Sequence, residues 1–303
     1  MNSATELDLC PAPSELPNNY LINGYKLLRP IGQGGFGITY LAIDELLDRP
    51  VVIKEQFPQH YCYRSAGTLD VCPLPEVDPA EYRSAMSNFL REMRLLAKLD
   101  HPHIVRTFTY FEAHQTAYYV TEHIDGSGLA DVAADYRKHL NHIPQQPLYA
   151  LMVRVLDALD YLHSRNILHL DIKPDNILVT RKGLPVLIDF GAALDLSERG
   201  SGTVIETPGY SPPEQGTPSA KLTPAADLYA FAATLYYCLT GLALPSGRQR
   251  LLFDQLKPLS SMRELTNYYH PRLLATIDKA LTPGIENRYP TAADWLRDLR
   301  PDC

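Results

Sequence analysis

The sequence has few cysteines and no block of basic residues. Its 303 residues include five cysteines, and no two of them have the CxxC spacing of zinc sites and redox motifs. Neither a disulfide framework nor a structural zinc site is therefore indicated. Lysine and arginine number 28 against 35 aspartates and glutamates, which gives a formal net charge of −7. This charge balance argues against nucleic acid as a partner bound by bulk electrostatics.

Long apolar segments are also scarce. The first residues lack a basic region followed by an apolar one, so a secretory signal is not expected. The uncharged run 228–244 spans 17 residues and contains threonines and a glycine. A membrane helix needs about 20 apolar residues, so this run is better interpreted as a buried core helix. We therefore predict no membrane span within this chain and a cytoplasmic location.

The composition and the changing pattern along the chain predict a globular protein of mixed structure. Hydrophobic residues make up 45%, which excludes general disorder, and the length suits one large bilobal domain or two small ones. Residues 1–20 are polar and rich in proline and resemble a tail. Short β-like runs separated by turns follow over residues 25–54 and predict an antiparallel meander.

The rest of the chain becomes progressively helical. The proline-rich segment 57–79 has no clean period and is predicted to be a long loop insertion. Residues 80–99 have helical periodicity, and two strand-like runs follow them. After Gly126 the pattern is mainly helical. The sequence therefore predicts a small β-rich part, residues 21–124, and a larger α-rich part, residues 125–303, which join near residues 124–128.

A glycine-rich turn is the first candidate for chemistry. Gly32, Gly34 and Gly37 form a G-x-G-x-x-G pattern, which lets backbone N–H groups approach phosphate oxygens closely but also occurs in ordinary hairpin turns. A strand follows the motif where a dinucleotide-binding fold would begin a helix. The pattern therefore favours a β-hairpin flap over phosphates.

Lys54 and Glu92 form a second candidate. Lys54 ends an apolar strand, and Glu92 lies on the amphipathic helix among apolar neighbours. Both could be solvated surface residues. Alternatively, they form a buried ion pair that holds the lysine ammonium in place to bind phosphate.

The segment from His169 to Asn176 and the Asp-Phe-Gly at Asp189 carry the strongest signal. This loop, HLDIKPDN, lies between two apolar runs. It presents a candidate general base, Asp171, a phosphate-neutralising cation, Lys173, and a hard oxygen ligand for a metal, Asn176. Asp189 adds a carboxylate at the end of a short strand. So many fixed residue types in this order are not expected of simple polar turns.

On these motifs the sequence resembles a eukaryotic-like (Hanks-type) Ser/Thr protein kinase of the bacterial branch, from about Tyr25 to Leu299. The resemblance implies that Asp171 is the catalytic base, that Lys173 contacts the γ-phosphate, and that Asn176 and Asp189 bind the metal. It also implies that Lys54 binds the α- and β-phosphates and pairs with Glu92. The implied ATP-binding set comprises Ile31, Gly32, Gly34, Gly37, Thr39, Val52, Lys54, Thr121, Glu122 and His123. Of these, Glu122 and His123 lie at the hinge whose backbone binds adenine, and Thr121 is the gatekeeper.

The resemblance also assigns substrate-docking and structural residues and reveals departures. By this resemblance, Thr207 is a threonine of the docking loop and Glu214 is the glutamate that closes that loop. Asp227 matches the helix aspartate that braces the catalytic loop, and Arg288 matches the arginine that pairs with the glutamate. Leu170 replaces the arginine that usually precedes the catalytic aspartate, which implies regulation without a phosphate clamp at this position. The cysteines of the insertion, Cys62 and Cys72, could pair or sense redox state, although two unpaired surface thiols are favoured.

The resemblance implies an α+β, two-lobed protein-kinase fold with ATP and Mg²⁺ (or Mn²⁺) bound in the cleft. The expected reaction transfers the γ-phosphate of ATP to Ser/Thr hydroxyls of protein substrates, including autophosphorylation, in signalling. Two alternatives remain at this point: a pseudokinase scaffold, which would not turn over ATP, and a small-molecule phosphotransferase, which would prefer a metabolite to a peptide.

Overall fold

The computed structural model of the protein describes residues 14–35, 37–197, 206–217 and 220–300. The chain divides into two compact units. The first contains the residues up to Asp100 and Val105–His123, and the second contains His101–Ile104 and the residues from Ile124 onward. The short segment 101–104 belongs to the second unit because the carbonyl of His103 accepts a hydrogen bond from Leu187 N (2.8 Å).

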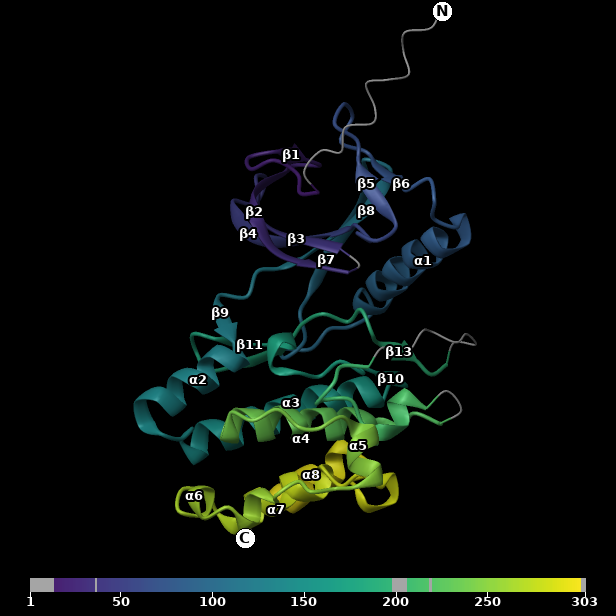
Figure 1. Cartoon of the computed structure of the whole chain (residues 1–303). Coiled ribbons are helices and arrows are strands. Elements are labelled where there is room, and N and C mark those ends of the chain that lie inside the picture. The colour runs from purple at the N-terminus through teal and green to yellow at the C-terminus, as the bar shows by residue number, and fades with distance from the viewer. Residues whose placement is uncertain (1–13, 36, 198–205, 218–219, 301–303) are drawn as a thin grey trace, which may run out of the picture. The chain divides into compact units, whose positions relative to one another are not determined.

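An antiparallel sheet dominates the first unit (Figure 1) and has six strands. Its strands lie in the order β1-β2-β3-β4-β8-β7. The meander predicted from residue 25 corresponds to β2, β3 and β4. The bounds are β1 Leu21–Ile22, β2 Tyr25–Gly34, β3 Gly37–Asp44, β4 Arg49–Gln56, β7 Thr107–Ala113 and β8 Thr116–Glu122.

The two faces of this sheet differ because side chains alternate along each strand. One face carries a closed apolar core that includes Ile38, Ile53 and Val120, each fully buried. The opposite face carries half-buried residues such as Thr39 and Val52. One face therefore stabilises the unit, and the other is accessible for binding.

The segment 57–79 is not a simple loop, which corrects the prediction. It forms an antiparallel hairpin of β5, Cys62–Arg64, and β6, Val71–Pro73, and the hairpin contributes Cys62 and Val71 to the buried core. The reason is non-local, because the segment covers the apolar face of the sheet. Cys62 and Cys72 are free thiols, but Cys62 is buried, so the expectation of two surface thiols is wrong for this residue.

Helix α1, Pro79–Leu96, begins directly after this hairpin. Asp78 caps it by accepting a hydrogen bond from Ala80 N (2.7 Å), and Pro79 occupies the first turn, where its missing N–H costs nothing. The helix buries one side, including Phe89, Glu92 and Met93. Its periodicity explains why the sequence predicted a helix over 80–99, although the helix itself ends at Leu96.

The second unit is mainly helical. Its larger helices are α2 Leu129–Leu140, α3 Gln145–His163, α4 Pro224–Thr240 and α7 Pro271–Ala280, and the shorter ones are α5 Gly247–Leu252, α6 Arg263–Thr266 and α8 Ala292–Leu299. Its short strands form two small sheets: β9 Gly126–Gly128, β11 Ile177–Thr180 and β12 Pro185–Leu187 in one, and β10 Ile167–Leu168 with β13 Leu194–Asp195 in the other.

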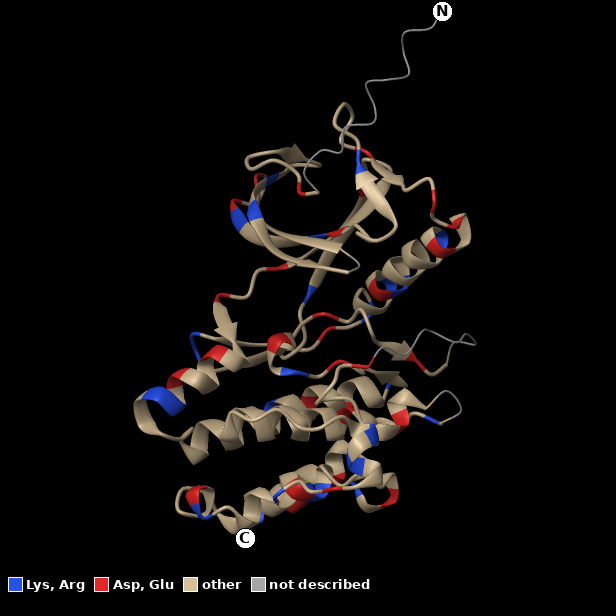
Figure 2. Ribbon diagram, in the orientation of Figure 1, with Lys and Arg blue, Asp and Glu red and all other residues tan. Residues whose placement is uncertain are grey.

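Helix α4 contains most of the uncharged run 228–244, and the prediction of a buried core helix is confirmed. Nearly all of its residues are buried, and it ends at Gly241, whose positive φ of 75° permits the left-handed turn. Across the described ranges, no helix is both long and apolar enough to span a bilayer. Figure 2 shows acidic and basic residues interspersed along the ribbons of both units.

Candidate active site

The register of the first unit's sheet gathers the predicted ATP-binding residues. Lys54 lies opposite Thr39 on one side and Tyr119 on the other, and Val52 lies opposite Thr121. Paired residues of antiparallel strands share a face, and residues two apart on a strand do so as well. These five side chains therefore belong to the same face, the one opposite the apolar core.

The glycine-rich turn joins β2 and β3, with Gly34 opposite Gly37. A Cβ on Gly37 would lie 2.4 Å from the carbonyl oxygen of Glu55, whereas a Cβ on Gly34 would meet open space. Gly37 is therefore required by the close approach of β4. No neighbouring atom requires glycine at positions 32 and 34. Glycine at these two positions is instead compatible with the predicted close approach of a ligand to this turn. Ile31, also predicted to contact ATP, is 43% exposed at the end of β2.

Lys54 and Glu92 form the ion pair that one interpretation of the sequence predicted. Lys54 Nζ lies 2.9 Å from Glu92 Oε1, and the side chains are 18% and 6% exposed. Tyr119 on β8 donates a hydrogen bond to the same carboxylate oxygen (2.7 Å). The sequence analysis missed Tyr119; its place two residues before Thr121 on one strand was the available signal. Together the two donors fix the carboxylate.

The predicted gatekeeper and hinge residues lie where β8 ends: Thr121 and Glu122 are its last two residues, and His123 follows it. Thr121 is buried, and Glu122 binds Arg106 in two ways. Its N–H donates to the Arg106 carbonyl (2.9 Å), and its carboxylate Oε1 accepts from the Arg106 N–H (2.8 Å). His123 is half-buried and is the last residue of the first unit. The Glu122 side chain is thus occupied in holding β8, so recognition of a base here would fall to the backbone.

The second unit assembles polar groups around Asp171. Its Oδ2 accepts hydrogen bonds from Lys173 Nζ and from Asn176 Nδ2, both at 2.7 Å. Its Oδ1 accepts one from the hydroxyl of Thr207 (2.6 Å). The carboxylate is therefore oriented by an ammonium, an amide and a hydroxyl. This is the environment of a group that can hold a hydroxyl and receive its proton.

Asp227 on α4 holds the backbone just before Asp171. Its Oδ2 accepts from His169 N (2.9 Å) and its Oδ1 from Leu170 N (2.8 Å), and His163 Nε2 lies 2.8 Å from Oδ2. Burial alone would raise the pKa of Asp227, but the hydrogen bond and charge of His163 and the nearby His169 lower it. The carboxylate therefore stays ionised, and His163 is a partner that the sequence analysis missed.

Leu170 has an unusual backbone conformation that these bonds maintain. Its φ is 61°, in the left-handed region that bulky side chains rarely adopt. Such a residue costs about 1–3 kcal/mol and persists only where its surroundings enforce it. Asp227 accepts from its N–H, and Gln215 Nε2 donates to its carbonyl (2.8 Å). The conformation turns the chain directly into Asp171.

Asn176 and Asp189 provide donors that suit a divalent cation. Asn176 uses its amide nitrogen for its bonds to Asp171, so its carbonyl oxygen is the atom suited to a metal. Asp189 also has a positive φ (60°), and its Oδ1 accepts from Gly191 N (3.4 Å). Within the described part of the chain no cluster of three or more His, Cys, Asp or Glu could hold a metal by itself. The oxygens fit a cation that is held together with substrate phosphates.

The docking residues are fixed by a buried ion pair. Arg288 donates from Nη1 and Nη2 to the two carboxylate oxygens of Glu214 (2.7 and 3.1 Å). The same guanidinium donates to the carbonyls of Thr282 and Pro283, both at 2.6 Å. Such a two-pronged bond is among the most directional in proteins. It ties the end of the loop that contains Thr207 to the helical core.

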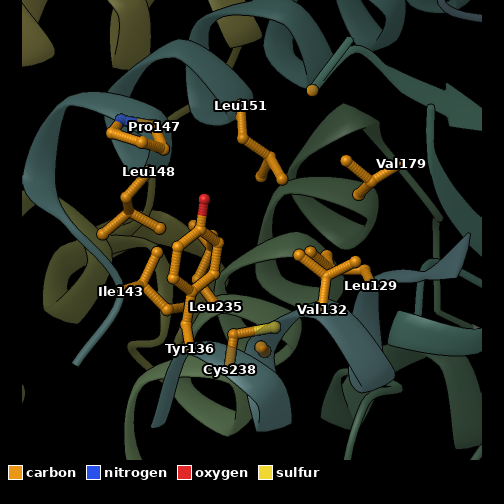
Figure 3. A pocket seen from close by; sticks show the side chains of 12 residues that line it. Leu129, Val132, Tyr136, Ile143, Pro147, Leu148, Leu151, Val179, Leu235 and Cys238 are labelled. Carbon is orange, nitrogen blue, oxygen red and sulfur yellow. The ribbon is translucent and has the colours of Figure 1, made fainter. Parts of the chain in front are cut away.

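A separate apolar cavity of about 70 Å³ lies in the second unit (Figure 3). Its lining comes from α2, α3 and α4 and from the β11 hairpin, and includes Leu129, Tyr136, Leu151, Val179 and Cys238. None of the lining residues belongs to the predicted site, and charged groups do not line it. The cavity therefore does not supply the chemistry, which rests on the polar loops.

Comparisons with known proteins show the family and the fold. The protein kinase domain model matches residues 25–289, and the chain belongs to the protein kinase family. Its fold is the protein kinase fold. A solved structure described as "PpkA-294 apo form" aligns with a TM-score of 0.83 and 30% identity, and the alignment covers 95% of this chain and all of that one.

Three curated relatives, all bacterial, illustrate the similarity. The serine/threonine-protein kinase PknA of Nostoc sp. is 31% identical over 92% of this chain and 47% of its own length. The serine/threonine-protein kinase PrkC of Bacillus subtilis is 29% identical over 91% of this chain and 40% of its own. The serine/threonine-protein kinase PknD of Mycobacterium tuberculosis is 34% identical over 72% of this chain and 30% of its own. The chain thus spans less than half the length of these relatives. The family implies use of ATP and a divalent metal and action on proteins.

Proposed function

We propose that this domain transfers the γ-phosphoryl group of ATP to serine and threonine hydroxyls of proteins, itself included. One observation carries the proposal. The hydroxyl of Thr207 donates a hydrogen bond to one carboxylate oxygen of Asp171, and the ammonium of Lys173 donates to the other. A substrate hydroxyl needs the same two neighbours, a carboxylate that takes its proton and a cation beside the arriving phosphate. Lysine two residues after the base is also the pattern of Ser/Thr kinases.

The remaining residues have supporting roles in this proposal. Lys54, held by Glu92, binds the α- and β-phosphates, and the sheet face around Val52 binds the nucleotide. Asn176 and Asp189 hold Mg²⁺ or Mn²⁺, whose charge neutralises phosphate oxygens. Because phosphoryl transfer has a loose transition state, most of the rate comes from positioning and charge neutralisation.

We also infer a cytoplasmic site of action. ATP is available there, and the described cysteines Cys62, Cys72 and Cys238 are free thiols, the form that a reducing compartment maintains.

The test compares Asp171→Asn with Asp175→Asn, the same substitution at an exposed position of the same loop. Incorporation of labelled phosphate into the protein itself and into a generic protein substrate is measured, and the labelled amino acids are identified. Asp171→Asn should lose about a hundredfold or more, as expected for a positioned base, whereas Asp175→Asn should stay within about twofold.

The same assay distinguishes the alternatives. Phosphate on tyrosine, or transfer to small hydroxyl compounds in preference to protein, would contradict the proposed substrate class. Lack of ATP turnover in the folded wild-type protein would favour a scaffold. Retention of a tenth of the wild-type rate by folded Asp171→Asn would remove Asp171 from its assigned role.

A further inference from the structure

A buried polar network occupies the core face of the first unit, on the side of the sheet away from Lys54. Its centre is the ion pair of Arg64, from the hairpin segment 57–79, and Glu55 on β4. Arg64 Nη2 lies 2.8 and 2.7 Å from the two carboxylate oxygens, and both side chains are 0% exposed. Two tyrosines complete the carboxylate's shell. Tyr118 donates to Oε1 (2.6 Å) and Tyr40 to Oε2 (2.8 Å).

In this network the guanidinium of Arg64 and the carboxylate of Glu55 both have several hydrogen-bond partners. The remaining guanidinium nitrogens of Arg64 donate to the carbonyls of Ser14 (2.8 Å) and Leu69 (2.9 Å). Burial and the charge of Glu55 raise the pKa values of Tyr40 and Tyr118, so both stay protonated donors. A buried ion pair adds little net stability compared with apolar residues, but it enforces one geometry. The feature is therefore better suited to fixing position than to increasing stability.

The buried network fixes the positions of Lys54 and Glu92. Glu55 follows Lys54 on β4, and Tyr118 precedes Tyr119 on β8, with Glu55 opposite Tyr118 and Lys54 opposite Tyr119. On one face of this strand pair Tyr118 binds Glu55, and on the other face Tyr119 binds Glu92. A shift of either strand would disturb both sets of bonds together.

The same hairpin segment also leads into the helix that carries Glu92. Asp78, at its end, caps α1. Tyr82 in the first turn of α1 packs against the core to which the segment contributes Phe57, Cys62 and Val71. The segment is thus anchored to β4 at its beginning and to α1 at its end. These are the two elements whose relative position decides whether Lys54 can reach Glu92.

We propose that the segment 57–79 is a brace that keeps the Lys54–Glu92 pair closed, and that Arg64 and Tyr118 are positioning residues acting through Glu55. The proposal rests on the proposed kinase function. When the brace loosens, a smaller fraction of molecules holds Lys54 ready for phosphate. The apparent affinity for ATP falls by that fraction, whereas saturating ATP restores the closed form. The KM for ATP should therefore rise while kcat changes little.

The first test is Tyr118→Phe, matched by Tyr269→Phe. Tyr118→Phe removes the hydroxyl's bonds to Glu55 (2.6 Å) and to His114 Nδ1 (3.0 Å). Tyr269→Phe removes the hydroxyl's bond to the Ile143 carbonyl in the second unit (2.7 Å). Tyr118→Phe should raise the KM for ATP about three- to tenfold, in line with the net contribution of a typical intramolecular hydrogen bond, with kcat within about twofold. Tyr269→Phe should leave the KM unchanged. Equal KM values in the two variants would overturn the brace.

The second test removes both charges in the double variant Glu55→Gln with Arg64→Met, so that no buried charge is left unpaired. The KM for ATP should rise about tenfold or more. Arg64→Lys keeps the charge but loses the bonds of the other guanidinium nitrogens to the Ser14 and Leu69 carbonyls, so its KM should lie between those of the double variant and the wild type. A double variant with wild-type KM would contradict the proposal.

Hydrogen exchange gives a readout that does not need activity. Backbone amides of α1 around Glu92 should exchange about tenfold faster in the double variant, and those of α7 should not change. If the wild-type protein transfers no phosphate, the proposed function fails, and the exchange of α1 alone then decides on the brace. Unchanged exchange in α1 would overturn it in either case.

Discussion

Replacing Asp227 by asparagine should be the most informative single change in the second unit. The substitution keeps the shape of the side chain but removes its charge. The wild-type carboxylate lies within hydrogen-bonding distance of three groups, His169 N, Leu170 N and His163 Nε2, at 2.8–2.9 Å and without exposure to solvent. Asparagine offers a single acceptor oxygen, so its NH₂ group must face at least one backbone N–H.

The magnitude follows from that mismatch. A hydrogen bond to a charged group contributes about 1.5–3 kcal/mol, and an unsatisfied buried donor costs about 1–3 kcal/mol. Loss of one such bond together with one orphaned N–H gives a decrease in the free energy of unfolding of about 2.5–6 kcal/mol. Because Asp227 also holds Leu170 in its left-handed conformation, Asp171 should lose its orientation, and kcat should fall by at least tenfold even where the variant is folded.

The assay is urea unfolding monitored by circular dichroism, combined with initial rates of phosphate transfer at low urea. Asp278→Asn is the matched control. Asp278 accepts from two backbone N–H groups, Leu259 N (2.7 Å) and Ser260 N (2.9 Å), but is partly exposed. It should lose only about 1–2 kcal/mol with little change in rate. A loss for Asp227→Asn no larger than for Asp278→Asn would refute the reasoning, as would an unchanged kcat.

Three further outcomes are expected. Asp189→Ala should decrease the metal-dependent affinity for ATP about tenfold or more while the protein stays folded, because the substitution removes a hard oxygen ligand. Titration calorimetry with Mg·ATP measures this affinity. An undiminished affinity would show that Asp189 is only a turn residue. Because Leu170 cannot bind a phosphate, the phosphatase-treated protein should keep most of its activity, and so should the triple alanine variant of the loop hydroxyls Ser197, Ser201 and Thr203, of which the last two lie outside the described residues. Initial rates on an exogenous protein substrate measure this, and a loss beyond about thirtyfold would overturn it. Burial lowers the pKa of His169, so as the pH falls the unfolded chain binds a proton before the folded chain does, and the folded state loses stability below about pH 6.5. The urea midpoint of unfolding should therefore decrease between pH 7.5 and 5.5. An unchanged midpoint over this range would contradict the prediction.

The catalytic loops could be predicted from the sequence because their chemistry is local. Asp171, Lys173 and Asn176 lie within six residues, and their mutual hydrogen bonds follow from that spacing. Lys54 and Glu92 are 38 residues apart, yet an apolar strand and an amphipathic helix carried enough pattern to suggest their pairing. The roles of these residues in catalysis stay predictions.

Long-range polar contacts could not be predicted in the same way. Arg64 lies in a proline-rich stretch without period, and nothing in its neighbours indicates that it is fully buried against Glu55. The hairpin of which it is part exists because the segment covers an apolar sheet face formed by other strands. Similarly, the bond of His163 to Asp227 joins residues 64 apart. Such contacts depend on the assembled fold and leave no periodic signal.

The burial of two thiols has a consequence for chemical labelling. Burial raises the pKa of Cys62 and of Cys238 to about 12, so at pH 7 only roughly 1 molecule in 10⁵ carries either as thiolate, the form that reacts. Cys72, on the same hairpin as Cys62, is partly exposed. With Cys10 and Cys303, which lie outside the described residues, replaced by serine, a maleimide fluorophore would select Cys72. A fluorophore could thus be attached at Cys72, on the hairpin that follows β4, the strand that contains Lys54.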